Sequence, residues 1–305
     1  MTAVHRLSRI EMICNAPDRL AEFYQSAFGF VRTVQSRMAA PAVAAITGIP
    51  GATAYTVRLR LDEQEIELTA FVPLGRAYPR GVSGRSPLFQ HVAIVVSDMA
   101  AAYERLSANA GVTAISTAGP QSLPASSGGV TAYKFRDPDG HPLELIAFPR
   151  DAIPARWQKP AATACIGIDH SALSVADTER SVAYYERLGL RRVGGSLNQG
   201  PQQDKLDGMA GAIVEVTALA PPLISTPHLE LLCYRQPARA LPLLGTNDIA
   251  ATRLVFWVQN GDMLDALCVQ NADAVLSGPV RFECGVRRAL LRDPDGHLLC
   301  LETAR

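Results

Sequence analysis

Two histidines and two glutamates recur at matching places along this 305-residue chain. Each histidine lies in an apolar or alternating segment typical of a β-strand, and each glutamate lies in a later strand-like segment. The four residues are His91, Glu144, His170 and Glu230. Imidazole nitrogens and carboxylate oxygens are protein ligands for Zn, Ni, Mn and Fe(II). The sequence therefore predicts a site for one divalent metal, provided that the fold brings these strands together.

The neighbours of the two glutamates indicate where their carboxylates point. Glu144 and Glu230 each stand between two leucines, and successive side chains of a strand alternate between its faces. If the leucines pack against helices, the carboxylates point to the opposite, concave face. A buried carboxylate is costly unless it is paired or coordinated. We therefore expect each glutamate to meet a cation on that face.

The strands that must carry these residues belong to an internal repeat. Residues 136–145 (RDPDGHPLEL) match residues 292–301 (RDPDGHLLCL), and residues 18–34 resemble residues 179–193. Each half of the chain also repeats itself more weakly. Repeats of this kind indicate one supersecondary unit used several times. The pattern predicts four modules, each with a strand, a helix and about three further strands.

The module boundaries follow from composition and from the repeat. Segments rich in Pro and Ala indicate a linker between the halves, and residues 38–53 and 194–211, rich in Ala, Gly or Gln, are expected to be loops. The predicted division is 1–150 with modules 1–75 and 86–150, a linker at 151–165, and 166–305 with modules 166–236 and 250–305.

Alignment of the four modules places the candidate ligands in two columns. The first strands contribute Arg9, His91, His170 and Arg253, and the last strands contribute Glu67, Glu144, Glu230 and Cys300. Only the second and third modules keep both a histidine and a glutamate. We expect structural ion pairs at Arg9 and Arg253 rather than an anion site, and a small buried thiol at Cys300.

Three motifs in these modules resemble one known family. They are H-x-A-x-x-V-x-D beginning at His91, F-Y-x-x-x-x-G-F beginning at Phe23, and D-P-D-G-x-x-x-E-L beginning at Asp137. Together they resemble the vicinal oxygen chelate superfamily, which includes glyoxalase I, extradiol dioxygenases, methylmalonyl-CoA epimerase and bleomycin and fosfomycin resistance proteins. The resemblance covers nearly the whole chain. It implies an α+β fold in which four βαβββ modules form two cup-shaped mixed sheets, the glyoxalase/extradiol dioxygenase fold.

In that family two modules share a cup, so the pairing of modules decides the ligand set. If each half of the chain makes its own cup, neither cup contains two histidines. If modules two and three share a cup, His91, Glu144, His170 and Glu230 come together, and the set resembles the metal site of bacterial-type glyoxalase I. We favour this second pairing because the lost ligands then fall together in the other cup. Co-ligands of one metal would bring His91 and His170 within about 4 Å of each other.

The resemblance implies a metal-dependent, glyoxalase-like lyase or isomerase that chelates two oxygens of a small-molecule substrate. Glu144 or Glu230 would then move a proton between neighbouring carbons. Two alternatives stay open: an extradiol dioxygenase that uses Fe(II), and a non-catalytic small-molecule-binding protein of the bleomycin-resistance type. Arg253 and Cys300 stand where two-domain dioxygenases carry a histidine and a glutamate, which argues against ring cleavage in the C-terminal half.

Composition argues against several other functions. The chain has 29 basic and 29 acidic side chains and a net charge of zero, with no basic stripe for nucleic acid or an anionic membrane. It has no signal-peptide-like apolar segment and no apolar run of about 20 residues. Its six scattered cysteines predict reduced thiols in a cytoplasmic protein. A homodimer stays open as the oligomeric state.

Overall fold

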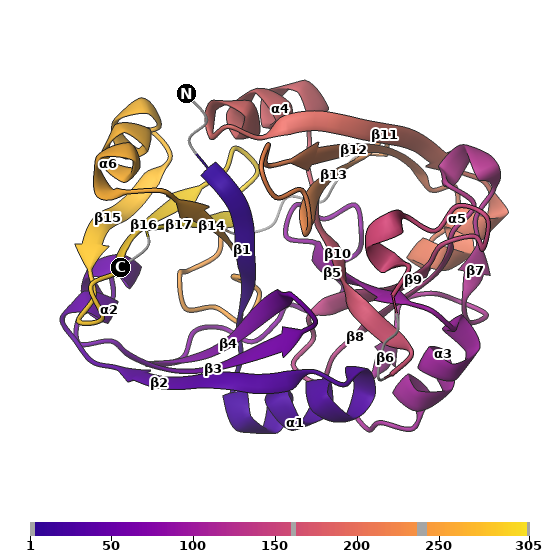
Figure 1. Cartoon of the computed structure of the whole chain (residues 1–305), viewed down its shortest axis with the longest axis horizontal. Helices are drawn as coiled ribbons and strands as arrows, with labels where there is room; N and C mark the ends of the chain where they lie inside the picture. Colours follow the sequence, from indigo (N-terminus) through magenta and orange to yellow (C-terminus); the bar gives the residue numbers. More distant parts are fainter. Residues whose placement is uncertain (1–3, 160–162, 237–242, 304–305) are drawn as a thin grey trace.

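The computed structural model describes residues 4–159, 163–236 and 243–303. Its elements follow the predicted repeat of a strand, a helix and further strands (Figure 1). Module one contains β1 (Val4–Ile13), α1 (Pro17–Phe28), β2 (Val31–Met38), α2 (Ala42–Thr47), β3 (Thr53–Leu61) and β4 (Gln64–Val72). Module two contains β5 (Gln90–Val96), α3 (Met99–Ser107), β6 (Thr113–Ala114), β7 (Gln121–Ser122), the 3₁₀ turn η1 (Ala125–Ser127), β8 (Thr131–Arg136) and β9 (Pro142–Ala147).

The second half of the chain repeats this order after a short 3₁₀ turn, η2 (Ala155–Trp157). Module three contains β10 (Cys165–Ser174), α4 (Thr178–Arg187), β11 (Arg191–Gln199), α5 (Pro201–Asp207), β12 (Ile213–Ala220) and β13 (His228–Tyr234). Module four contains β14 (Arg253–Val258), α6 (Gly261–Gln270), β15 (Val275–Arg281), β16 (Arg287–Arg292) and β17 (Leu298–Thr303).

The boundaries of the main helices have local causes. Asp98, Asp177 and Asn260 precede α3, α4 and α6, and each side chain accepts a hydrogen bond from a backbone N–H in the first turn. Such caps satisfy one of the N–H groups that a helix start leaves free. Helix α1 begins with Pro17, whose fixed φ suits a first helical position, and ends at Gly29 in the left-handed conformation. These caps fix where each helix leaves its first strand.

The strands form two mixed sheets, and each sheet joins a module from each half of the chain. The inner-module sheet, made by modules two and three, has the order β11-β12-β13-β10-β5-β9-β8-β6. The outer-module sheet, made by modules one and four, has the order β15-β16-β17-β14-β1-β4-β3-β2. The central pairs β5–β10 and β1–β14 are antiparallel. The predicted α+β class is confirmed, and the modules pair in the favoured way, two with three and one with four.

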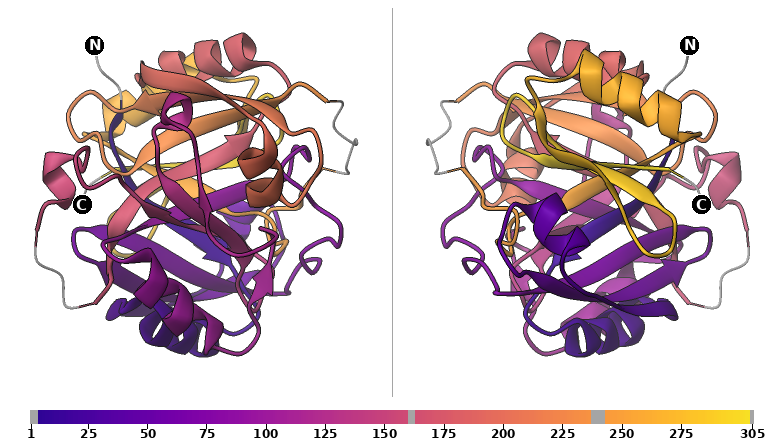
Figure 2. Two further views of the ribbon diagram at one scale, coloured as in Figure 1. Left: turned by 90° about the vertical axis from the view of Figure 1, so that its right-hand side faces the viewer. Right: turned by 90° about the vertical axis from the view of Figure 1, so that its left-hand side faces the viewer.

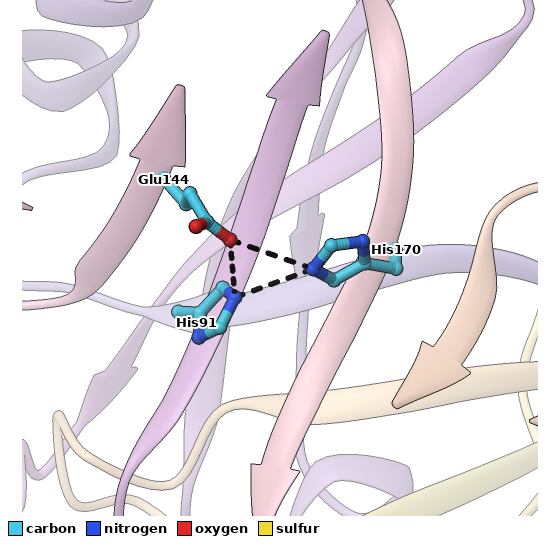
Figure 3. A group of neighbouring side chains, drawn as sticks. All are labelled: His91, Glu144 and His170. Carbon is cyan, nitrogen blue, oxygen red and sulfur yellow. Dashed lines mark hydrogen bonds and ion pairs between the residues drawn. The ribbon is translucent and has the colours of Figure 1, made fainter. Parts of the chain in front are cut away.

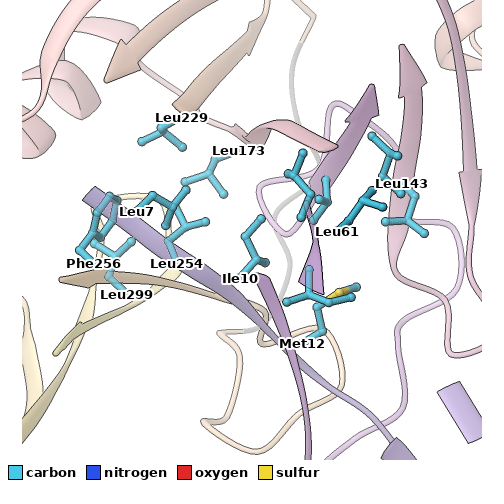
Figure 4. Close-up of a cluster of buried hydrophobic side chains, with 14 of the residues drawn as sticks. Leu7, Ile10, Met12, Leu61, Leu143, Leu173, Leu229, Leu254, Phe256 and Leu299 are labelled. Carbon is cyan, nitrogen blue, oxygen red and sulfur yellow. The ribbon is translucent and has the colours of Figure 1, made fainter. Parts of the chain in front are cut away.

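A common hydrophobic core lies between the two sheets (Figure 4). Leu7, Ile10 and Leu254 of the outer-module sheet and Leu173 and Leu229 of the inner-module sheet are at most 2% exposed. Burial of each such side chain contributes roughly 1.5–3 kcal/mol. Because the leucine faces meet in the core, the polar side chains that alternate with the leucines point to the outer faces of the sheets. Figure 2 shows the ribbon from two opposite sides.

The two DPDG turns connect one sheet to the other. The hydroxyl of Tyr24 in α1 donates to Asp137, which lies in the turn between β8 and β9, at 3.1 Å. The hydroxyl of Tyr185 in α4 donates to Asp293, which lies in the turn between β16 and β17, at 2.9 Å. Each turn therefore receives a buried tyrosine from a helix that belongs to the other sheet.

The histidine after each DPDG turn is part of the same connection. His141 Nδ1 lies 2.9 Å from Asp137, and its Nε2 lies 2.9 Å from the carbonyl oxygen of Ile13 in β1. His297 Nε2 lies 2.9 Å from the carbonyl oxygen of Ser174 in β10. Both histidines therefore connect their turn to a strand of the other sheet.

Two predicted loops contain short helices, so the loop predictions for residues 38–53 and 194–211 are wrong in part. Helix α2 interrupts the first and buries Val43 and Ile46. Helix α5 interrupts the second, begins with Pro201 and buries Leu206. Alanine is a strong helix former and proline suits a first helical position, so local sequence supports both helices.

The proposed domain limits and linker stay predictions. Residues 1–3, 160–162, 237–242 and 304–305, which those limits include, lie outside the described residues. The described part of the predicted linker contains η2, and Trp157 of this turn is buried against Ala93 and Ile166 of the inner-module sheet. The described part of the predicted linker therefore packs on the inner-module sheet, in addition to joining the two halves of the chain.

Candidate metal centre

The register of three strands places the predicted ligands on one face of the inner-module sheet. Ala93 of β5 pairs with His170 of β10 on one side and with Glu144 of β9 on the other. His91 lies two residues before Ala93, and residues two apart on a strand share a face. His91, Glu144 and His170 therefore project from adjacent strands into one space, as Figure 3 shows.

The fourth predicted ligand reaches the same face from β13. Ala172 pairs with His91 across β5 and β10, and with Glu230 across β10 and β13. Glu230 Oε2 lies 3.4 Å from Nε2 of His170. All four residues proposed from the sequence are thus brought together by the pairing of modules two and three.

The ligand-type atoms converge closely (Figure 3). Nε2 of His91 lies 3.3 Å from Nε2 of His170 and 2.9 Å from Oε2 of Glu144. Nε2 of His170 lies 3.6 Å from the same carboxylate oxygen. The distance between the two histidines meets the limit of about 4 Å expected for co-ligands of one metal.

Burial and neighbouring charge act differently on the two imidazoles. Burial lowers the pKa of His91, in spite of the adjacent Glu144 carboxylate. Burial also opposes the charged form of His170, but Glu230, Asp169 and Glu144 outweigh it and hold the pKa of His170 well above its ordinary value. Burial thus dominates at His91, whereas the surrounding carboxylates dominate at His170.

The carboxylates show the same balance. Burial alone would raise the pKa of Glu144, but the adjacent His91, His170 and Lys134 hold that pKa well below its ordinary value. The pKa of Glu230 is also lowered because His170 and His228 outweigh the effect of burial. Both carboxylates therefore favour the ionised form, which is the form that binds a metal.

The residues fit a divalent metal by donor type and by position. One ligand atom each from His91, Glu144 and His170 lies within 4.8 Å of the others. Nδ1 of His91 is buried and has no hydrogen-bond partner among the described residues. No hydrogen bond to Nδ1 from those residues therefore opposes the ring orientation in which Nε2 faces the cluster. Two imidazoles with one or two carboxylates suit Zn, Ni, Mn or Fe(II).

Asp169 contacts the ring nitrogen of His170 that faces away from the cluster. The sequence pattern did not indicate this residue. Its Oδ2 lies 3.2 Å from Nδ1 of His170, and its Oδ1 accepts a hydrogen bond from Trp157 at 3.1 Å. A carboxylate on the far nitrogen of a ligand histidine fixes the orientation of the ring. The strand register shifts between Ile168 and His170, and such a bulge leaves an extra residue, here Asp169, outside the regular alternation.

His228 lies at the edge of the same cluster. It pairs with His170 across β10 and β13, and its Nε2 lies 3.6 Å from Oε1 of Glu230. Asp169, His170 and His228 form a second group of ligand-type atoms within 4.8 Å of one another. His228 therefore contacts one carboxylate oxygen of Glu230, and His170 contacts the other.

A cavity of about 390 Å³ opens above the ligands, and α5 closes one side of it. Lys134 of β8 pairs with Glu144 in the sheet, and its ammonium group contacts Asp207 of α5 at 2.7 Å. Gln203 and Tyr234 also donate to Asp207, at 2.7 and 3.0 Å. Sequence reasoning missed this network, although the alternation of residues 131–136 places Lys134 on the same face as Glu144.

The outer-module sheet uses the equivalent positions for ion pairs. Arg9 donates two hydrogen bonds to Glu302, at 2.8 and 2.6 Å, and its Nε lies 3.3 Å from Glu67. Arg253 contacts Glu11 at 3.4 Å. Cys300 is buried, and burial raises the pKa of its thiol to about 12. The expected ion pairs and buried thiol are therefore present in this cup.

The chain belongs to the Glyoxalase/Bleomycin resistance protein/Dioxygenase superfamily. The sequence model of that superfamily matches residues 6–145 and 167–301, and a second model with the same description matches residues 90–206. No curated protein matches the chain in sequence. The recognised resemblance to this superfamily is confirmed.

Two solved structures show how far the fold likeness extends. Glyoxalase I from Zea mays is 18% identical over 98% of this chain and 92% of its own, with a TM-score of 0.62. A putative dioxygenase from Bacillus subtilis is 14% identical over 99% of this chain and 86% of its own, also with a TM-score of 0.62. At these identities the likeness shows a common fold. Among the described residues, none of the helices has the length and apolar character needed to span a membrane.

Proposed function

We propose that the inner-module cup is a metal centre and that the protein is a glyoxalase-like lyase or isomerase of a small oxygenated substrate. The observation that carries this proposal is the convergence of two imidazoles and two carboxylates from four strands. Nε2 of His170 lies 3.3 Å from Nε2 of His91 and 3.4 Å from Oε2 of Glu230. Ion pairing alone would not need two histidines with Nε2 atoms facing each other.

Each side chain has a distinct role in this proposal. His91, Glu144 and His170 would hold the metal, with Asp169 orienting His170. A divalent metal bound there would supply Lewis acidity toward two neighbouring substrate oxygens. Glu144 is almost fully buried against His91, whereas the side chain of Glu230 is 21% exposed toward the cavity. Glu230 is thus the better placed carboxylate to take a proton from one substrate carbon and return it to the next.

The cavity supports a small substrate. Its volume of about 390 Å³ lies near the lower end of the range for small-molecule sites. The Lys134 ammonium adds positive charge on the same face as Glu144, and it is held by Asp207. A substrate that develops negative charge on its oxygens would be favoured there. Burial of the ligands keeps bulk water from the reacting carbons.

The first test is the metal content of protein purified without a chelator. We expect about one divalent metal per chain, with loss of that metal in His91→Ala and His170→Ala measured by elemental analysis. Glu67→Gln, which changes the equivalent glutamate of the outer-module sheet, serves as the matched control and should keep the metal. Metal-free wild-type protein under these conditions would contradict the proposal and favour a binding protein without turnover.

The second test asks which reaction the centre performs. Isomerisation of the hemithioacetal of methylglyoxal and a thiol, followed by absorbance, should depend on Glu230. We expect Glu230→Gln to lower kcat by about 10²-fold or more, as loss of a general base does, while the metal is retained. Equal kcat in wild type and variant would exclude Glu230 as the base.

One observation favours an extradiol dioxygenase as the second candidate. His91, Glu144 and His170 form a two-histidine, one-carboxylate face, the ligand set that non-haem Fe(II) oxygenases use. Anaerobic reconstitution with Fe(II), followed by catechol and then O₂, tests it. A coloured ring-cleavage product that persists in Glu230→Gln would support the dioxygenase over the isomerase, because ring cleavage does not need Glu230 as a proton carrier.

A further inference from the structure

The outer-module sheet carries a second cavity that the proposed metal chemistry does not use. Its volume is about 620 Å³, compared with about 390 Å³ for the cavity above the metal ligands. Helix α2, strand β2 and the end of β15 with the residue that follows it supply an apolar wall. This wall includes Val34, Met38, Ala42, Val280 and Phe282.

Arg288, on the floor of this cavity, uses only one of its three guanidinium nitrogens in a hydrogen bond to the described residues. Nε of Arg288 donates to Glu302 at 2.7 Å, and the guanidinium carbon lies 5.0 Å from the centre of the Phe282 ring. Among the described residues, no acceptor lies within hydrogen-bonding distance of its two terminal nitrogens, and these nitrogens are not sealed from solvent. Arg288 is therefore fixed in place by Glu302 and Phe282, and its planar end is available to a ligand.

The two acids on the floor are shared with other arginines, so Arg288 does not have either acid to itself. Glu302 accepts two hydrogen bonds from Arg9. Glu67 accepts two hydrogen bonds from Arg58, at 3.0 and 2.7 Å, and also faces Arg9. Arg58 also lies 3.6 Å from Glu65, so the three guanidinium groups and three carboxylates of this network balance in charge.

The excess of positive charge lies at the rim of the cavity. Arg37 and Arg281 line the cavity, and neither forms an ion pair within the described part of the chain. Arg37 lies over the ring of Tyr55, with its guanidinium carbon 4.6 Å from the ring centre. Glu283 is the acidic side chain that lines the cavity beside them.

We propose that this cavity binds a small amphipathic carboxylate. The carboxylate would accept two hydrogen bonds from the terminal nitrogens of Arg288, a geometry for which guanidinium is suited. The apolar body would lie against Val34, Met38 and Phe282. The site needs no metal and does not rest on the function of the inner-module cup.

The test uses hexanoate as the probe and isothermal titration calorimetry on the full chain. We expect saturable binding of hexanoate and weaker binding of hexanol, which has the same chain without the charge. Arg288→Met should weaken hexanoate binding about tenfold or more, the usual consequence of losing hydrogen bonds to a charged group. Arg287→Met is the matched control, because Arg287 is adjacent in β16, pairs with Asp265 of α6 and does not line the cavity.

Further variants keep the test decisive if Arg288→Met fails to fold. Arg37 and Arg281 are exposed, so the double variant Arg37→Met/Arg281→Met should fold and should lower the affinity for hexanoate about fivefold. His170→Ala should leave hexanoate binding unchanged. The proposal is overturned if wild type shows no saturable binding, if hexanol binds as well as hexanoate, if His170→Ala abolishes binding, or if a folded Arg288→Met protein or the double variant binds as wild type does.

Discussion

The inner-module and outer-module sheets place different chemistry at equivalent strand positions. His170 pairs with Ala93 in one sheet, and Arg253 pairs with Glu11 at the corresponding place in the other. Neutral imidazole offers a lone pair to a metal, whereas guanidinium has no acceptor atom and stays protonated. A change of residue type at two first strands, together with Cys300 in place of a glutamate, therefore distinguishes the set of ion pairs from the candidate metal centre.

The two cups also differ in how they balance charge. In the outer-module sheet, Arg9 satisfies Glu302 and also faces Glu67, so the cup holds its carboxylates by itself. In the inner-module sheet, the carboxylates of Glu144 and Glu230 converge on His170. The outer cup thus pairs its carboxylates with arginine, whereas in the inner cup both carboxylates face one imidazole.

The largest effect is expected from breaking the ion pairs of the outer-module sheet. Arg9→Met should lower the free energy of unfolding by about 3–5 kcal/mol, because it breaks a buried ion pair and removes the two hydrogen bonds that Arg9 donates to Glu302. Urea unfolding measures this change. Arg32→Met, which breaks an exposed pair with Asp18, is the control and should cost less than about 1 kcal/mol. Similar losses in both variants would show that burial of the Arg9 network adds nothing.

A somewhat smaller effect is expected from the inner-module sheet when metal is added. A divalent metal at 100 times its dissociation constant should stabilise the fold by about 2.7 kcal/mol, since the metal binds only the folded site. Thermal unfolding with Zn²⁺ or Ni²⁺, and again after a chelator, measures the increment. His170→Ala should lose the increment and Glu67→Gln should keep it. An increment retained in His170→Ala would place the metal elsewhere.

The two DPDG turns allow a finer comparison of the sheets. Tyr185→Phe should cost about 2 kcal/mol of stability, because Tyr185 is the one hydrogen-bond donor to Oδ2 of Asp293 among the described residues. Tyr24→Phe should cost about 1 kcal/mol, because Asp137 keeps His141 as a partner for the same oxygen. Chemical denaturation of both variants checks the order. Equal costs would mean that His141 does not support Asp137.

The smallest effect concerns pH at the turn of the inner-module sheet. Burial opposes the charged form of His141, but Asp137 outweighs it and raises the pKa of His141 above the ordinary value of 6.5. A raised pKa in the folded state stabilises the protein fully below the unfolded pKa, and this stabilisation is lost as pH rises through the folded pKa. His141→Gln should remove that part of the pH dependence. Parallel stability–pH curves for wild type and variant would contradict it.

The sequence predicted the modules because repeated motifs report on local structure. The columns containing His91, Glu144, His170 and Glu230 followed from alignment of the repeats, and strand alternation indicated the face on which the glutamates lie. The choice of module partners could not be derived from local pattern, because either pairing buries the same leucines. It was favoured only because the lost ligands would then share one cup.

Other site residues were missed because nothing in the sequence pattern singles them out. Lys134 and Asp207 are lone charged residues on different modules, and only the approach of α5 to β8 makes them a pair. Asp169 became visible only through the irregular register of β10. Glu302 and Arg288 lie next to the aligned columns rather than within them, so their ion pair depends on side-chain reach across the outer-module sheet.

The order of the strands also sets the order in which the chain can complete its sheets during synthesis. The strands of the inner-module sheet lie in one continuous stretch, residues 90–234, whereas those of the outer-module sheet come from residues 4–72 and 253–303. The inner-module sheet can therefore form once the chain has been translated as far as Tyr234. Until β14 arrives, β1 has an unpaired edge, and Leu7 and Ile10 lack their partners from module four. An unpaired, apolar edge of this kind is prone to aggregation, so the newly made chain is most vulnerable at its first strand until its last module has been translated.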